Sequence, residues 1–108
     1  MKPEQALTHQ VMTWLALNNI LHYRVRNTGT IIHRPGGVVF GRDRYWRQQQ
    51  GCADILAWKG GKFYAIELKS HTGRLSQAQM EWLKRFEAEG GIAKVARSLD
   101  DVESIFKS

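Results

Sequence analysis

Apolar residues near the N-terminus recur at the three- and four-residue spacing of an amphipathic helix. We expect this helix to begin at Pro3, because proline suits the first helical position, and to end near Asn18-Asn19. Glu4, three residues before Leu7, continues the apolar stripe at its N-terminal end. The stripe itself consists of Leu7, Val11, Trp14 and Leu15.

Strand-like runs follow in the first half and the centre of the chain. Residues 21–26 alternate between apolar and polar, and the runs 53–58 and 62–69 flank Gly60-Gly61. Two glycines at the centre of a two-residue turn predict a hairpin, because both positions can take a positive φ. Residues 28–50 are rich in Gly, Arg and Gln, and fit either a hairpin or a long ordered loop.

A second helix and a last strand complete the pattern. Ser76 is placed to be the N-cap of this helix, with Gln79 as its capping-box partner, and Gly90-Gly91 ends it. Residues 92–97 form a further strand, and Ser98 caps a short final helix. The predicted order is α-β-β-β-α-β-α, which describes an α/β fold.

Length and composition favour a single domain over residues 1–108. A hydrophobic content of 43% supports one core. The single cysteine, Cys52, excludes an internal disulfide, and with the four scattered histidines it forms no zinc pattern. No stretch approaches the ~20 apolar residues that span a bilayer, and the N-terminus has no apolar signal core, so we expect a cytoplasmic protein and no membrane partner.

The net charge of +6 is concentrated in one segment. Residues 22–50 hold six arginines against one acid, Asp43, and so carry a net +5. Arginine forks pair with phosphate oxygens, and interleaved aromatic rings can stack on bases, which favours nucleic acid as a partner over an ordinary solvated basic loop. The candidate nucleic-acid-binding residues are Arg24, Arg26, Arg34, Arg42, Arg44, Arg47, Tyr45 and Trp46.

The predicted hairpin register brings two acids together. With Gly60 and Gly61 as the loop, Asp54 lies directly opposite Glu67, and Lys69 points to the same face. Two opposed carboxylates repel unless a cation sits between them, and a hard divalent ion such as Mg²⁺ accepts such oxygen ligands. The alternative is a pair of solvated acids, with Lys69 in an ordinary ion pair.

A metal ion held there fits phosphodiester chemistry. It can polarise the phosphate, lower the pKa of a bound water and stabilise the departing oxygen. Lys69 is placed to orient the attacking water or to neutralise negative charge in the transition state. Because no Gly-rich phosphate cradle or Ser/His/Asp arrangement is present, we expect no small-molecule cofactor or substrate.

Three stretches resemble the VRR-NUC family, the virus-type replication-repair branch of the PD-(D/E)xK nucleases. They are Gly51-Cys52-Ala53-Asp54, Glu67-Leu68-Lys69 and Gly73-Arg74-Leu75-Ser76-Gln77-Ala78-Gln79. The resemblance implies a restriction-endonuclease-like fold, with a central mixed β-sheet flanked by helices. Ala53 stands where the superfamily name has proline, a position that shapes the backbone and is not a ligand.

The resemblance also implies roles for single residues. Asp54 and Glu67 would bind Mg²⁺ or Mn²⁺ together with the backbone carbonyl of Leu68, and Lys69 would be the catalytic lysine. Glu4 matches a first-helix acid that reaches the metal directly or through water, although an acid in the first turn is also favourable for the helix alone.

Gln79 matches a glutamine that family members carry near the active site. Its capping role is an equally good explanation, and both roles can hold together.

By this resemblance the chain is expected to be a metal-dependent DNA endonuclease. Single-domain members resemble dimeric phage nucleases that act on branched DNA such as four-way (Holliday) junctions, so a homodimer is expected. Two alternatives stay open: a non-catalytic DNA-binding or assembly module with a nuclease fold, and a restriction or resection nuclease.

Overall fold

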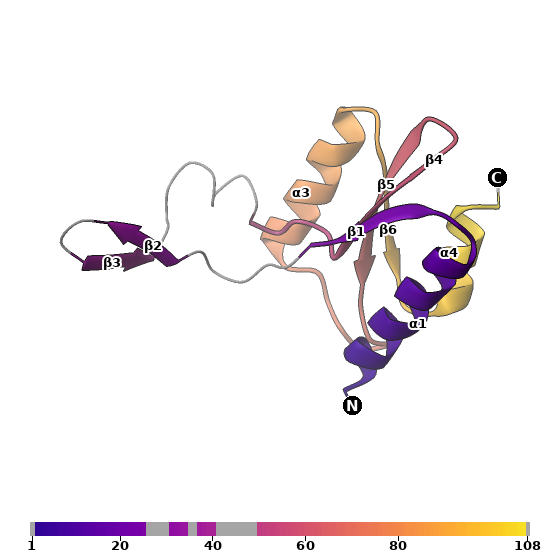
Figure 1. Cartoon of the computed structure of the whole chain (residues 1–108), viewed down its shortest axis with the longest axis horizontal. Helices are drawn as coiled ribbons and strands as arrows, with labels where there is room; N and C mark the ends of the chain where they lie inside the picture. Colours follow the sequence, from indigo (N-terminus) through magenta and orange to yellow (C-terminus); the bar gives the residue numbers. More distant parts are fainter. Residues whose placement is uncertain (1, 26–30, 35–36, 41–49, 108) are drawn as a thin grey trace.

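The computed structural model describes residues 2–25, 31–34, 37–40 and 50–107, with the backbone alone for 31–34 and 37–40. The predicted α/β fold is confirmed, with a mixed four-stranded sheet flanked by three helices (Figure 1). The elements in chain order are α1 (Pro3–Leu17), β1 (Leu21–Arg24), β2 (Ile31–Arg34), β3 (Gly37–Phe40), β4 (Ile55–Lys59), β5 (Lys62–Leu68), α3 (Gln77–Ala88), β6 (Ile92–Ala96) and α4 (Leu99–Ile105).

Strand β5 is the centre of the main sheet, whose order is β1-β4-β5-β6. It runs antiparallel to β4 and parallel to β6. The β4–β5 turn has positive φ at both Gly60 and Gly61, as a two-residue hairpin turn requires. The predicted register is confirmed from the Lys59–Lys62 pair to the Ile55–Ile66 pair.

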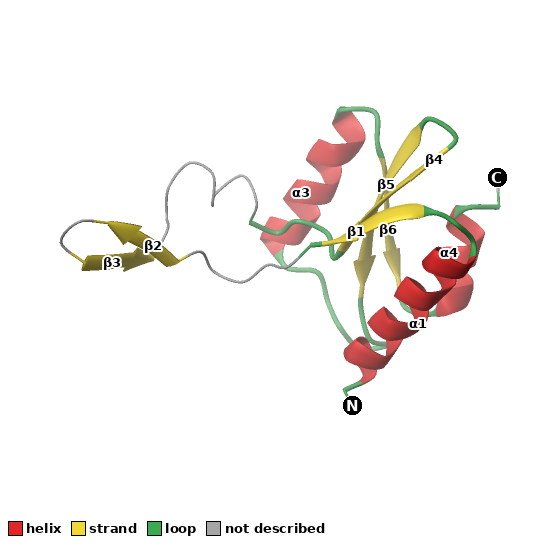
Figure 2. Cartoon of the chain, in the orientation of Figure 1, coloured by secondary structure: helices red, strands yellow, loops and turns green. Residues whose placement is uncertain are grey.

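Helices cover the two faces of the sheet differently (Figure 2). On one face, α1 and α4 pack on the side chains of Ile55, Ile66 and Leu68 in a continuous core. On the other face, α3 packs through Leu83 on a smaller cluster that includes Ala65. Because both faces are covered, the run from Tyr64 to Leu68 is buried throughout, and a charged residue in it lies inside the protein.

Three strands of the main sheet are shorter than the sequence predicts. Strand β1 ends at Arg24, although the Val25 amide still donates to the Asp54 carbonyl at 2.8 Å. Strand β4 begins at Ile55 and not at residue 53. Strand β6 ends at Ala96, because the Arg97 amide donates to an Asp101 carboxylate oxygen.

The basic segment, for which the sequence left two possibilities open, contains a hairpin. Strands β2 and β3 pair antiparallel as a separate two-stranded sheet. The stretches 26–30, 35–36 and 41–49 lie outside the described residues.

Candidate active site

Four of the residues singled out from the sequence meet on the α3 side of the sheet. Asp54 directly precedes β4, Glu67 is near the end of β5, Lys69 directly follows β5, and Gln79 is in the first turn of α3. Contacts connect three of them: Glu67 Oε2 lies 3.6 Å from Lys69 Nζ and accepts a 3.1 Å hydrogen bond from Gln79 Nε2. The structure therefore joins a loop, a strand and a helix at a single carboxylate.

Glu67 is the centre of this group. Its side chain is 2% exposed, and Glu67 is the only charged residue among the buried residues that the structure describes. Oxygen Oε2 has the two partners given above, whereas Oε1 is buried and forms no hydrogen bond within the described structure. A buried carboxylate oxygen without a partner is costly, so either a proton or a cation is needed there.

Asp54 is held by the backbone of β5 and does not form the cross-strand pair predicted from the register. The pairing ends one step earlier, at Ile55–Ile66. If the ladder continued in this register, the Leu68 amide would donate to a backbone carbonyl just before β4. It donates instead to the side-chain oxygen Asp54 Oδ2 at 2.8 Å. The Asp54 side chain thus replaces a ladder acceptor and stays on the side of the sheet where Glu67 lies.

Burial and the neighbouring Asp54 both disfavour a negative charge on Glu67. Burial, and then the negative charge of Asp54 and a hydrogen bond to it, raise the pKa of Glu67 from 4.5 to about 8, against the opposing effect of Lys69. Burial and the neighbouring acid therefore both disfavour the ionised form of Glu67. Burial, followed by the charges of Glu67 and Asp54, also raises the pKa of the nearby Cys52 thiol to about 11.

Gln79 caps α3, as predicted, and its side chain also contacts Glu67. In the capping box, the Gln79 backbone N–H donates to Ser76 Oγ at 3.1 Å, and the Ser76 N–H donates to Gln79 Oε1 at 2.9 Å. Because the carbonyl end of the side-chain amide is held by the capping box, its NH₂ end points to Glu67. The helix cap thereby orients a donor toward the buried acid.

Two glycines of the motifs allow the close packing around these groups. Gly51 has φ +79°, and a Cβ there would lie 2.3 Å from the Ala78 carbonyl oxygen in the first turn of α3. A Cβ on Gly73 would lie 3.4 Å from Lys69 Cδ. The sequence shows these glycines only as parts of a family motif, because their neighbours become visible only once α3 is packed on the sheet.

The donor set fits a hard divalent cation. Mg²⁺ in proteins takes one or two carboxylates and completes its shell with water and substrate oxygens, and Asp54 and Glu67 supply two. Among the described residues no three His, Cys, Asp or Glu side chains gather as a metal cluster. Glu4 is exposed on α1 and is not brought into such a cluster with Asp54 and Glu67.

Most of the predicted DNA-binding residues lie outside the described part of the chain. Arg24 is exposed on β1 and pairs with Ile55, so it lies on the sheet face that α1 and α4 cover, opposite to the face of Glu67. The backbone of Arg34 belongs to β2, and its side chain is outside the described part. The others also lie outside the described residues: Arg26, Arg42, Arg44, Tyr45, Trp46 and Arg47.

Comparison with known proteins agrees with this geometry. The sequence matches the VRR-NUC domain over residues 2–100, which includes all four residues of the site. No curated protein matches the sequence. Within the described part of the chain, none of the helices combines the length and apolar character that a membrane crossing requires.

Proposed function

Because this chain belongs to the VRR-NUC family of the PD-(D/E)xK nucleases, we propose that it is a metal-dependent DNA endonuclease with Asp54, Glu67 and Lys69 as its reaction centre. Membership of the family implies a nuclease and a DNA substrate. The observation that carries the proposal is the buried Oε1 of Glu67, which has no partner among the described residues and lies in a group with Asp54 and Lys69. A fold has little to gain from such an oxygen unless it binds something.

Each residue has a distinct role in this proposal. Asp54 and Glu67, with the Leu68 carbonyl, would hold Mg²⁺ or Mn²⁺, which when bound activates water and polarises the phosphodiester. Lys69, whose side chain is only 14% exposed, directs its ammonium group into the site and would orient the attacking water or balance charge on the phosphate. Gln79 keeps Glu67 in place through the Oε2 hydrogen bond.

The basic segment is proposed to bind the DNA backbone beside this centre. The segment begins and ends near Asp54: the amide of Val25, near its start, donates to the Asp54 carbonyl, and Gln50, its last residue, is four residues from Asp54. Contacts to phosphate should make affinity fall steeply with salt, independent of base sequence. A triple Ala variant should bind DNA more weakly, with a flatter salt slope and unchanged metal affinity; it replaces Arg42, Arg44 and Arg47.

An unchanged salt slope in that variant would remove the segment from the DNA interface. Fluorescence anisotropy with a labelled duplex at several salt concentrations provides the measurement.

Branched DNA is the proposed substrate, and a homodimer the proposed assembly. Resolving a four-way junction needs two coordinated cuts on opposing strands, and one small domain supplies one reaction centre, so two copies related by a two-fold axis are needed. Light scattering should show a dimer at working concentration. A monomer that persists in the presence of junction DNA would refute this assembly.

A cleavage panel tests the function as a whole. Labelled linear duplex, flap and four-way junction DNA are incubated with Mg²⁺, Mn²⁺ or EDTA. The proposal predicts metal-dependent cuts, with the junction as the best substrate. Preference for linear duplex or flap would indicate a restriction or resection nuclease, and binding without cleavage under any metal would indicate a non-catalytic module.

A further inference from the structure

Arg97, at the end of β6, binds the loop that follows the candidate active site. Its Nη1 donates to the carbonyl oxygens of Ser70 at 2.6 Å and Gly73 at 2.7 Å, with a longer contact of 3.5 Å to that of His71. Between these residues, the Gly73 amide donates to the Ser70 carbonyl at 3.2 Å. A single guanidinium nitrogen therefore holds both ends of a closed turn.

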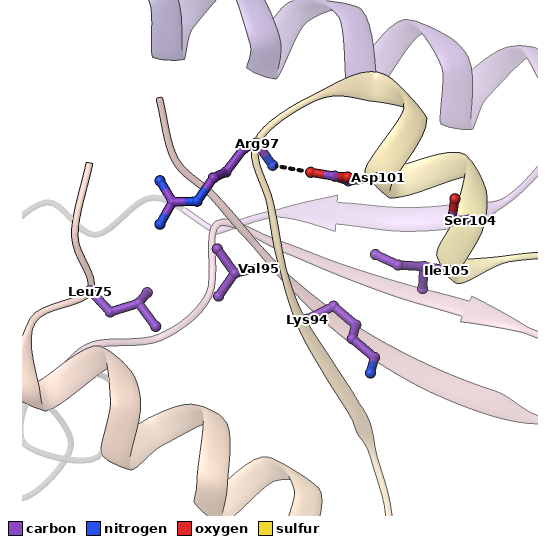
Figure 3. Close-up of a pocket in the computed structure, with 7 residues that line it drawn as sticks. All are labelled: Leu75, Lys94, Val95, Arg97, Asp101, Ser104 and Ile105. Atoms are coloured by element: carbon purple, nitrogen blue, oxygen red, sulfur yellow. Dashed lines mark hydrogen bonds between the residues drawn. The ribbon is translucent and has the colours of Figure 1, made fainter. Parts of the chain in front are cut away.

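The backbone of Arg97 is held by a hydrogen bond to α4. Its backbone amide donates to Asp101 Oδ2 at 2.8 Å, and Figure 3 shows the guanidinium extending away from Asp101. Within the described part of the chain, the guanidinium forms no ion pair with a carboxylate. Its charge is thus directed at backbone carbonyls, where hydrogen bonds from an ionised donor are stronger than those from a neutral one.

The turn that Arg97 holds packs against the catalytic lysine. Ser70 directly follows Lys69, and a Cβ added at Gly73 would be in van der Waals contact with the lysine stem, 3.4 Å from Lys69 Cδ. A shift of this turn would move the stem of Lys69 and change the 3.6 Å separation between its Nζ and Glu67 Oε2. Arg97 therefore acts on the site from outside it.

We propose that Arg97 is a positioning residue that fixes Lys69 for catalysis by clamping the turn from Ser70 to Gly73. This inference rests on the proposed nuclease function. It separates positioning from metal binding, because none of the contacts of Arg97 is to Asp54 or Glu67.

Direct contact with DNA phosphate is the competing explanation for Arg97. Arg97 and Lys94 both line a pocket of about 600 Å³. The ammonium group of Lys94 points away from the Arg97 guanidinium (Figure 3). If positive charge in this pocket contacts DNA, loss of Lys94 should also weaken DNA binding. If Arg97 acts through the turn, loss of Lys94 should have no effect, which makes Lys94→Ala a matched control.

The test compares wild type with Arg97→Ala, Arg97→Lys and Lys94→Ala in single-site cleavage kinetics and in amide hydrogen exchange. Arg97→Ala should lower kcat about 10- to 100-fold, the range for lost positioning of a reacting group, with KM changed less than about 3-fold. Exchange at residues 70–75 should accelerate. Arg97→Lys, which retains the charge but not the guanidinium fork, should be intermediate, and Lys94→Ala should match wild type.

Several results would overturn the clamp. One is a raised KM with a flattened salt dependence and unchanged kcat in Arg97→Ala, which would make Arg97 a phosphate contact. Wild-type kcat and wild-type amide exchange in Arg97→Lys would also overturn the clamp. This variant decides the question if Arg97→Ala fails to fold. If wild type cuts no DNA, the proposed function fails, whereas the exchange data still decide whether Arg97 holds the turn.

Discussion

Replacing Glu67 by Gln should remove a pH dependence from the stability of the metal-free protein. Glutamine keeps the shape of the side chain and can still accept the Gln79 hydrogen bond, but it has no charge to bury. Its NH₂ group can also donate to Asp54, as the protonated acid would. At pH 8 we therefore expect the metal-free Glu67→Gln protein to be more stable than wild type.

The direction follows from the two pKa values of Glu67. In the unfolded chain the carboxyl has its ordinary pKa of 4.5, and in the folded protein the pKa is about 8. Between these values the folded state binds more protons, so the stabilisation from protonated Glu67 is complete below pH 4.5 and is lost as the pH rises to about 8. The free energy of unfolding falls by at most about 1.4 kcal/mol per pH unit in this window.

Urea unfolding in EDTA at pH 5, 6, 7, 8, 9 and 10 measures the effect. Subtracting the values for Glu67→Gln from those for wild type cancels the other titrating groups. We expect the difference to become steadily less favourable to wild type with rising pH, and to flatten above pH 8. Parallel pH profiles for the two proteins would refute the raised pKa of the buried Glu67 carboxyl.

Three further outcomes follow from the same geometry. Gln79→Ala and Ser76→Ala should each cost about 1 kcal/mol of stability through loss of the helix cap. Only Gln79→Ala should weaken Mn²⁺ binding measured by calorimetry, because only Gln79 contacts Glu67. Equal Mn²⁺ affinities in the two variants would exclude a role of Gln79 in metal binding. Gly51→Ala should lower the thermal unfolding midpoint more than Gly60→Ala does. Both glycines have positive φ, but only at Gly51 would the added Cβ meet a backbone atom, the Ala78 carbonyl oxygen at 2.3 Å. Equal losses would contradict that close approach. Metal binding at pH 7 should release a proton, seen as a binding enthalpy that depends on the ionisation enthalpy of the buffer, and a buffer-independent enthalpy would contradict it.

Local signals accounted for much of the fold and the site. Gly60 and Gly61 permit one tight turn, and that turn determines the register of β4 and β5 almost to Asp54. Ser76 and Gln79 form a capping box three residues apart, so the start of α3 also depends on neighbours in the sequence. Such features could be predicted because their partners lie within a few residues.

Other features depend on contacts between distant segments. Glu67 is buried because β6 and α3 enclose the end of β5, and no pattern around residue 67 shows that enclosure. Asp54 was predicted to pair across the hairpin, but the Leu68 amide takes its carboxylate and ends the ladder. Arg97 is 24 residues from the Gly73 carbonyl that it binds, which places this contact beyond local reasoning.

Cleavage by an Asp54→Asn protein tests the central claim most directly. Asparagine still offers an oxygen to the Leu68 amide, so the 2.8 Å hydrogen bond and the fold should survive while the charge is lost. With Mg²⁺ and junction DNA, a folded Asp54→Asn protein should cut no faster than wild type does in EDTA. Cleavage at a near wild-type rate would contradict the assignment of the active site.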